Sequence, residues 1–194
     1  MIWLHIFTEE PSLKIVLDNI IPKIIPEQTH FKVYPHQGKQ DLEKALKTTL
    51  PSISKMPGAK IIITRDQDND DCHVLKSNLN DIVHNTIGCE YKIRIICKEL
   101  ESWFLGDLVA VENAFTRFKS GQHINRSELR TVDNISNPSD FLKKIIPEYS
   151  NSDTLPKLET AQKIAKHLNL NNNKSESFNQ MVKAIKDLTN IKIN

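Results

Sequence analysis

Four carboxylates occupy six consecutive positions of this chain, directly after an apolar β-branched run at residues 61–63. They are Asp66, Asp68, Asp70 and Asp71, in a chain that has only 24 acidic residues among 194. Such a cluster needs a cation or a proton to relieve its repulsion. Hard divalent cations such as Mg²⁺ take carboxylate oxygens as ligands. The segment is therefore the first candidate for a metal site.

Hydrophobic periodicity predicts the strands and helices around these carboxylates. Strands are predicted over residues 2–7, 31–34, 59–64 and 91–97, and helices over 13–25, 41–50 and 74–82. Pro22 is expected to kink or divide the first helix. This alternation predicts an α/β fold with a mainly parallel four-stranded sheet and helices on both faces.

Beyond residue 99 the pattern becomes helical. Helices are predicted near residues 103–115, 139–146, 158–168 and 178–188. Their apolar stripes predict a helical C-terminal extension, residues 116–194, that packs on an α/β domain formed by residues 1–115.

Right-handed crossovers bring the loops after all parallel strands to one edge of the sheet. The chemistry-bearing residues of those loops are Glu9 and Glu10 after the first strand, His36, Gly38 and Lys39 after the second, the aspartate cluster after the third, and Glu99 and Glu101 after the fourth. Gly38 is expected at positive φ. The topology thus predicts a carboxylate-rich bowl with one lysine.

Phosphoryl transfer with one or two divalent metals, Mg²⁺ or Mn²⁺, suits such a bowl. Carboxylates hold the ions, which activate a water and offset phosphate charge, and Lys39 could contact the phosphate. A calcium-binding EF-hand loop is excluded by spacing: counted from Asp66, the sixth position is Asp71 rather than Gly, and the twelfth is Ser77 rather than Glu.

The same segments resemble the Toprim-like proteins, and most closely a bacterial branch related to the overcoming-lysogenization-defect (OLD) nucleases. The resemblance is carried by Glu9-Glu10-Pro11-Ser12, by Asp66-Gln67-Asp68-Asn69-Asp70 and by Lys98-Glu99-Leu100-Glu101-Ser102-Trp103-Phe104-Leu105-Gly106-Asp107. It covers residues 2 to about 110 and implies a Toprim/Rossmann-like fold. It also implies a Mg²⁺-dependent nuclease, often encoded beside an ATPase partner and associated with antiviral defence against phage.

The resemblance implies roles for single residues as well. Glu9 corresponds to the family's invariant glutamate, a metal ligand or general acid/base. Asp66 and Asp68 correspond to the principal metal ligands, with Asp70, Glu99 and Glu101 as further ligands. The chain departs from the family pattern at Glu10, where glycine is usual.

Composition constrains the partners. A balance of 26 basic against 24 acidic residues gives a net charge of +2, which neither requires nor excludes nucleic acid. Basic residues gather in the last part of the chain, at Lys157, Lys163, Lys166, Lys174, Lys183, Lys186 and Lys192. This local surface could guide a polyanion toward the bowl.

Three unpaired cysteines, the absence of a long apolar segment and the lack of a signal-peptide pattern predict a cytoplasmic protein with no membrane contact.

Two other functions remain open from the sequence. One is a receiver-like phosphoacceptor, in which Glu9 and Glu10 hold Mg²⁺ and Asp66 accepts a phosphoryl group. The other is a non-catalytic binding or assembly module with a vestigial acidic site. An aspartate-rich loop can also be no more than a helix cap and a solvated turn.

Overall fold

The four strands form one parallel sheet in the order β2-β1-β3-β4 in the computed structural model, which describes residues 1–189. Their bounds are β1 (Ile2–Thr8), β2 (Thr29–Pro35), β3 (Ala59–Asp66) and β4 (Tyr91–Ile96). The central strand β3 is buried at every position except Lys60. Its Ile61, Ile62 and Ile63 provide the apolar run that a sheet covered on both faces requires. The predicted parallel α/β sheet is confirmed.

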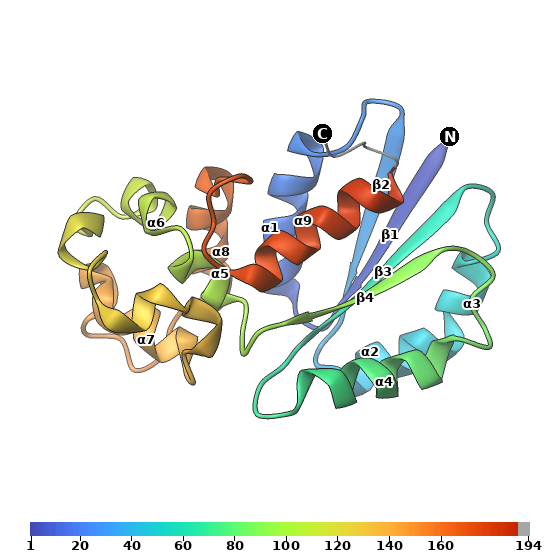
Figure 1. Ribbon diagram of the computed structural model, residues 1–194, viewed down its shortest axis with the longest axis horizontal. Helices are drawn as coiled ribbons and strands as arrows, with labels where there is room; N and C mark the ends of the chain where they lie inside the picture. The colour runs from blue at the N-terminus through green and yellow to red at the C-terminus, as the bar shows by residue number, and fades with distance from the viewer. Residues whose placement is uncertain (190–194) are drawn as a thin grey trace.

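Helices cover both faces of the sheet (Figure 1). Helices α1 (Pro11–Ile20) and α9 (Glu176–Leu188) lie on one face, and α2 (Lys39–Thr48), α3 (Leu50–Ile53) and α4 (Cys72–Val83) lie on the other. The alternation of β3 divides its side chains accordingly: Ile62 belongs to the core under α1 and α9, whereas Ile61 and Ile63 belong to the core under α2 and α4.

The remaining helices lie beyond the carboxyl ends of the strands (Figure 1). They are α5 (Glu101–Leu105), α6 (Leu108–Ala114), α7 (Pro138–Ile145) and α8 (Lys157–Ile164). Short 3₁₀ helices connect the elements at Ile21–Lys23, Ser120–Gln122, Ser127–Arg130, Val132–Asn134, Pro147–Tyr149 and Ala165–His167. None of the helices within residues 1–189 is long and apolar enough to cross a membrane.

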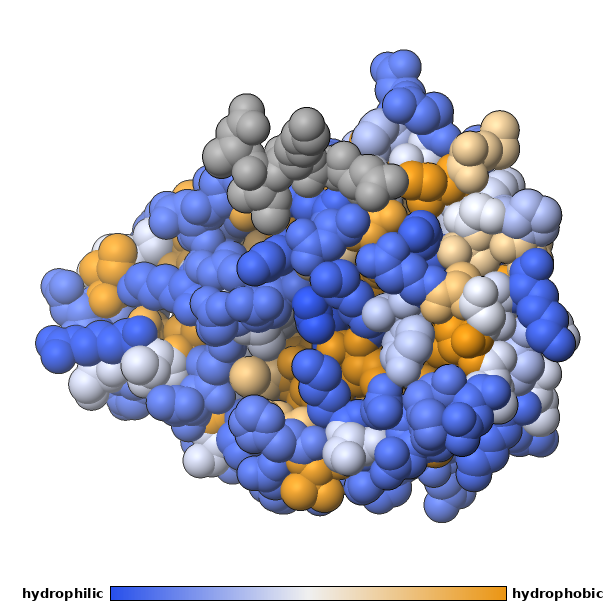
Figure 2. All heavy atoms as spheres, turned by 45° about the vertical axis from the view of Figure 1, so that its right-hand side comes forward, coloured by the Kyte–Doolittle hydropathy of each residue, from blue (hydrophilic) through white to orange (hydrophobic). Residues whose placement is uncertain are grey.

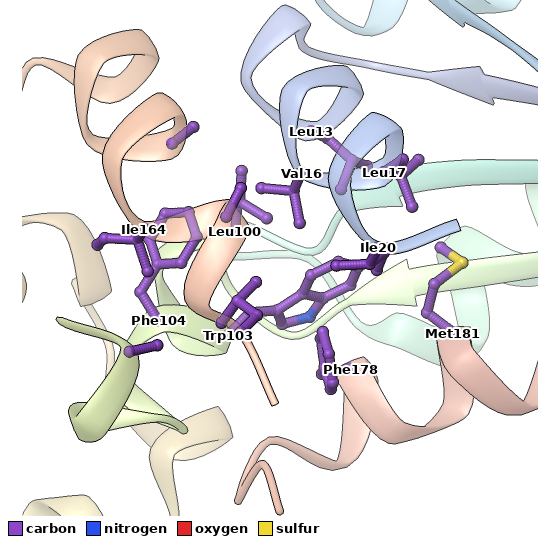
Figure 3. Close-up of a cluster of buried hydrophobic side chains, with 14 of the residues drawn as sticks. Leu13, Val16, Leu17, Ile20, Leu100, Trp103, Phe104, Ile164, Phe178 and Met181 are labelled. Atoms are coloured by element: carbon purple, nitrogen blue, oxygen red, sulfur yellow. The ribbon is translucent and has the colours of Figure 1, made fainter. Parts of the chain in front are cut away.

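One hydrophobic core joins the helical part to the sheet. Figure 3 shows side chains of α1, α5, α8 and α9 meeting around Trp103. The Trp103 ring is fully buried, packs edge-on against Phe178 at 5.2 Å between centroids, and donates its Nε1–H to Ser177 Oγ at 2.9 Å. The C-terminal helices therefore pack on the α/β part. The domain boundary at residue 115 stays a prediction.

The predicted helix over residues 103–115 is in fact two helices. Gly106 separates α5 from α6, and a Cβ atom there would lie 2.0 Å from Asn173 Oδ1. Asp107 begins the second helix, because its side chain accepts a hydrogen bond from the Ala110 amide at 3.0 Å. Contacts with the distant loop at Asn173 thus interrupt the helix, although the apolar pattern of the sequence is continuous.

The two local expectations from proline and glycine hold. Helix α1 ends at Ile20 and continues as a 3₁₀ turn that contains Pro22. Gly38 has φ +91° at the turn before α2.

Candidate active site

The ends of β1 and β3 bring two predicted acidic residues into contact. Glu9 Oε2 accepts a hydrogen bond from the backbone amide of Asp66 at 3.3 Å. The Glu9 side chain is 12% exposed, and Asp66 is 7% exposed. Because β1 and β3 are adjacent parallel strands, the residues that follow them meet at the carboxyl edge of the sheet. Two acidic residues distant in sequence thus meet at this edge.

The loops after β3 and β4 are also joined. The Asp68 amide donates to the Lys98 carbonyl at 2.9 Å, and the Lys98 amide donates to Gln67 Oε1 at 3.3 Å. Asp68 and Lys98 have φ of 50° and 60°, in the left-handed region that non-glycine residues rarely occupy. Backbone strain of this kind clusters at functional sites, where the surroundings hold it.

Burial perturbs the carboxylates of this edge. Burial raises the pKa of Asp66 well above its usual value, and the nearby Glu10, Glu101 and Glu9 raise it further. Desolvation and the charge of Glu99 raise the pKa of Asp68. Desolvation also raises the pKa of Glu9, although Arg65 opposes this change. Burial, reinforced by neighbouring negative charges, thus favours the protonated forms of these carboxyl groups.

Glu101 is the most deeply buried of the acids. It is 1% exposed, and its Oε2 has no hydrogen-bond partner within the described residues. Burial raises the pKa of Glu101 to about 7, against the opposing charge of Lys157. A buried carboxylate oxygen without a partner is costly, so it indicates a site that a proton or a ligand completes.

Lys157 supplies a positive charge to the bowl from the helical part. It is the first residue of α8, and its Nζ lies 3.5 Å from Glu10 Oε1. Burial lowers the pKa of Lys157, but Glu101, Glu10, Glu99 and Asp66 together raise it above its ordinary value. The packing of α8 against α1 brings this lysine to the sheet edge.

Arg65 supplies the second positive charge. Its side chain is 8% exposed and lies 3.7 Å from Glu9 through Nε, 3.3 Å from Glu43 through Nη1, and 3.7 Å from Asp70 through Nη2. Arg65 was not predicted as a site residue, although a buried arginine at the end of an apolar strand indicates an ion pair.

The other predicted residues lie at the rim. Lys39 is exposed at the start of α2 and forms no ion pair within residues 1–189, so Lys157 is the lysine that the structure places among the carboxylates. Glu99 Oε2 accepts from the Ser139 amide at 3.0 Å, at the beginning of α7. Asp71 caps α4 by accepting from the amides of His73 and Val74 at 2.8 and 3.0 Å.

The carboxylate oxygens at this edge are ligands of the kind that Mg²⁺ prefers. Their present positions do not suit metal binding. No three His, Cys, Asp or Glu side chains of the described part of the chain stand where they could hold a metal ion. Arg65 and Lys157 provide the positive charges near these carboxylates instead. Metal binding would therefore require carboxylates of this edge to move closer together.

The match to the Domain of unknown function (DUF4276) family extends over residues 8–186, most of the chain. The chain belongs to this family. The DUF4276 match contains both the strand-end acids and Lys157, so it includes the helical part as well as the sheet. No match was found among curated proteins, and none among solved structures.

Proposed function

We propose that this DUF4276 protein is a divalent-metal-dependent nuclease that hydrolyses phosphodiesters of nucleic acid with Mg²⁺ or Mn²⁺. The observation that carries the proposal is the contact between Glu9 and Asp66 at the carboxyl edge of a parallel sheet, with the unpartnered Glu101 Oε2 in the same charge cluster. Perturbed carboxylates gathered from separate strands are typical of catalytic sites.

Each residue has a role in this proposal. Asp66, Asp68 and Glu101 would hold the ion, which when bound lowers the pKa of a water and offsets phosphate charge. Glu9 has a raised pKa and can carry a proton as general acid/base. Lys157 would contact the phosphate in place of the predicted Lys39, because it lies among the carboxylates.

The resemblance to Toprim-like proteins supports the same proposal. The resemblance also extends the proposal to an ATPase partner, to antiviral defence and to action in the cytoplasm. These three points rest on the resemblance alone.

One observation favours the alternative of a non-catalytic module with a vestigial acidic site. The ion pairs of Arg65 with Glu9 and of Lys157 with Glu10 could replace a metal permanently. For the receiver-like alternative, labelling of Asp66 by acetyl phosphate is the distinguishing result.

Metal should stabilise the native protein if the proposal is right. Binding to the native state alone adds RT ln(1 + [L]/Kd), which is about 2.7 kcal/mol at a hundredfold excess over Kd. We expect millimolar Mn²⁺ or Mg²⁺ to raise the melting temperature by several degrees in a thermal-shift experiment, and Asp66→Asn to abolish the increase.

Asp71→Asn is the matched control, since Asp71 is in the same acidic run but caps α4, and asparagine caps equally well. This variant should keep the full increase. A melting curve of the unmodified protein that ignores both metals would favour the vestigial module.

A further inference from the structure

A second surface of the molecule lies along the outer edge of the sheet. A groove of about 530 Å³ is lined by His73, Lys76, Ser77 and Asn80 of α4 and by residues 91–94 of β4. β4 is the last strand of the sheet, between α4 on one face and α9 on the other (Figure 1). Figure 2 turns the right-hand side of that view forward and shows hydrophobic side chains in a hollow surrounded by hydrophilic ones.

The backbone of β4 is open on this side. The carbonyls of Glu90 and Ile96 accept hydrogen bonds from β3 and from the residue after it, at 3.1 and 2.9 Å. Because the backbone alternates, residues 91, 93 and 95 direct their polar groups away from β3. The Ile93 carbonyl accepts from Arg94 Nη1 at 3.0 Å, which occupies one position of the open edge.

The charges along the groove favour an anion over a second copy of the chain. Lys76 is exposed and without an ion pair within residues 1–189, and Arg94 is held by the carbonyls of Ile93 and Gln180. Lys92 pairs with Asp187 at 2.8 Å. In an antiparallel pair of these edges centred on Ile93, Lys92 would lie opposite Arg94 of the other copy, which is unfavourable.

One aromatic ring lies among these cations. Tyr91 is half-buried, lines the groove, and donates its hydroxyl to Asn80 Oδ1 at 2.7 Å, which fixes the ring. Cations that follow a phosphate backbone, combined with an aromatic ring on which a base stacks, are the features of single-stranded nucleic-acid binding sites.

One end of the groove adjoins the acidic loop along the chain. His73 is the second residue of α4, and its amide bonds to Asp71, the last residue of the loop that carries Asp68 and Asp70. We propose that a single strand of nucleic acid lies in this groove, with its phosphates on Lys76 and Arg94 and a base on Tyr91. This inference rests on the proposed function and gives the path of the nucleic-acid strand toward the carboxylates.

The test is binding of a fluorescein-labelled 15-nucleotide single strand, DNA or RNA, measured by anisotropy in EDTA so that no metal chemistry contributes. We expect Tyr91→Leu to weaken binding about tenfold, because it removes the stacking surface. Tyr91→Phe keeps the ring and should keep the affinity.

Lys76→Ala should weaken binding a few-fold and make the slope of log K against log salt shallower by about 0.7, the value for one phosphate contact on a single strand. Lys47→Ala is the matched control, since Lys47 is an exposed lysine on α2 outside the groove. Circular dichroism of each variant establishes that it is folded.

Affinities of Tyr91→Leu and Lys76→Ala within twofold of the unmodified protein would overturn the inference, as would tighter binding of a hairpin duplex than of the single strand. Competition by poly-glutamate as effective as competition by unlabelled oligonucleotide would also overturn it.

The two proposals can fail separately. Groove-dependent binding without cleavage in Mn²⁺ leaves the path correct and the nuclease assignment wrong. Metal-dependent cleavage, with binding unaffected by Tyr91→Leu and Lys76→Ala, would leave the nuclease assignment correct and the path wrong.

Discussion

Asp66→Ala is expected to abolish metal-dependent cleavage of nucleic acid while the protein stays folded. Asp66 lies at the centre of the acidic cluster, within the influence of Glu9, Glu10 and Glu101. Its loss would remove a principal ligand, and with it both activation of water and offset of phosphate charge. The loss should reach several orders of magnitude in rate. The measurement is cleavage of labelled single strands in Mn²⁺, with the ATPase partner added if one is required.

Stability separates this result from unfolding. Because Asp66 is buried among like charges, replacement by alanine should leave metal-free stability unchanged or higher in a urea titration. Cleavage by Asp66→Ala at the parent rate, in a preparation free of contaminating nuclease, would show that the site is elsewhere.

Lys157→Met is expected to have the second largest effect. It removes the cation that faces Glu10, Glu101 and Glu99. We expect cleavage to fall about a hundredfold, as when one preorganised electrostatic contact to the reacting group is removed. Lys14→Met is the control, since Lys14 pairs with a single carboxylate, Asp18, at the surface of α1. It should keep parental cleavage.

Lys157→Met should also change the pH dependence of stability, through its effect on Glu101. The pKa of Glu101 is raised to about 7 in the folded state, above its ordinary value of 4.5, so the folded protein binds the proton more tightly than the unfolded chain. Its contribution to stability is therefore present at low pH and lost as the pH rises from about 4.5 through 7.

Without Lys157 this pKa rises further, because Lys157 opposes the increase. The stability deficit of Lys157→Met should consequently grow between pH 5 and pH 8 in urea titrations. A deficit independent of pH would indicate that Lys157 acts only through packing of α8.

The fold could be predicted from the sequence because its signals are local and strong. The apolar runs of residues 2–7 and 59–64, the helical spacing between them, Pro22 and Gly38 each determine nearby backbone geometry. The convergence of Glu9 with Asp66 needed only the parallel topology, since every strand then ends at one edge.

The cations of the site could not be predicted in the same way. Lys157 lies far from the acids in sequence, and only the packing of α8 on α1 brings it to Glu10. Arg65 directly follows the predicted strand of residues 59–64, and its three carboxylate partners come from separate segments. Local patterns carry no information about such distant pairs.

Some lysines of the predicted basic surface in the C-terminal part already have partners within the protein. Lys163 pairs with Glu159 at 2.6 Å, and the Lys174 ammonium bonds to the Leu129 carbonyl at 3.4 Å. Lys192 lies outside the described residues. A guiding role for these lysines stays a prediction.

Direct titration with Mn²⁺ tests whether the strand-end carboxylates form a metal site. Calorimetry in two buffers of different ionisation enthalpy measures both binding and proton release. Because burial and neighbouring charges raise the pKa values of Asp66 and Glu101, we expect saturable Mn²⁺ binding at neutral pH with release of protons, lost in Asp66→Asn. Absence of binding at millimolar Mn²⁺, or equal binding by Asp66→Asn, would contradict it.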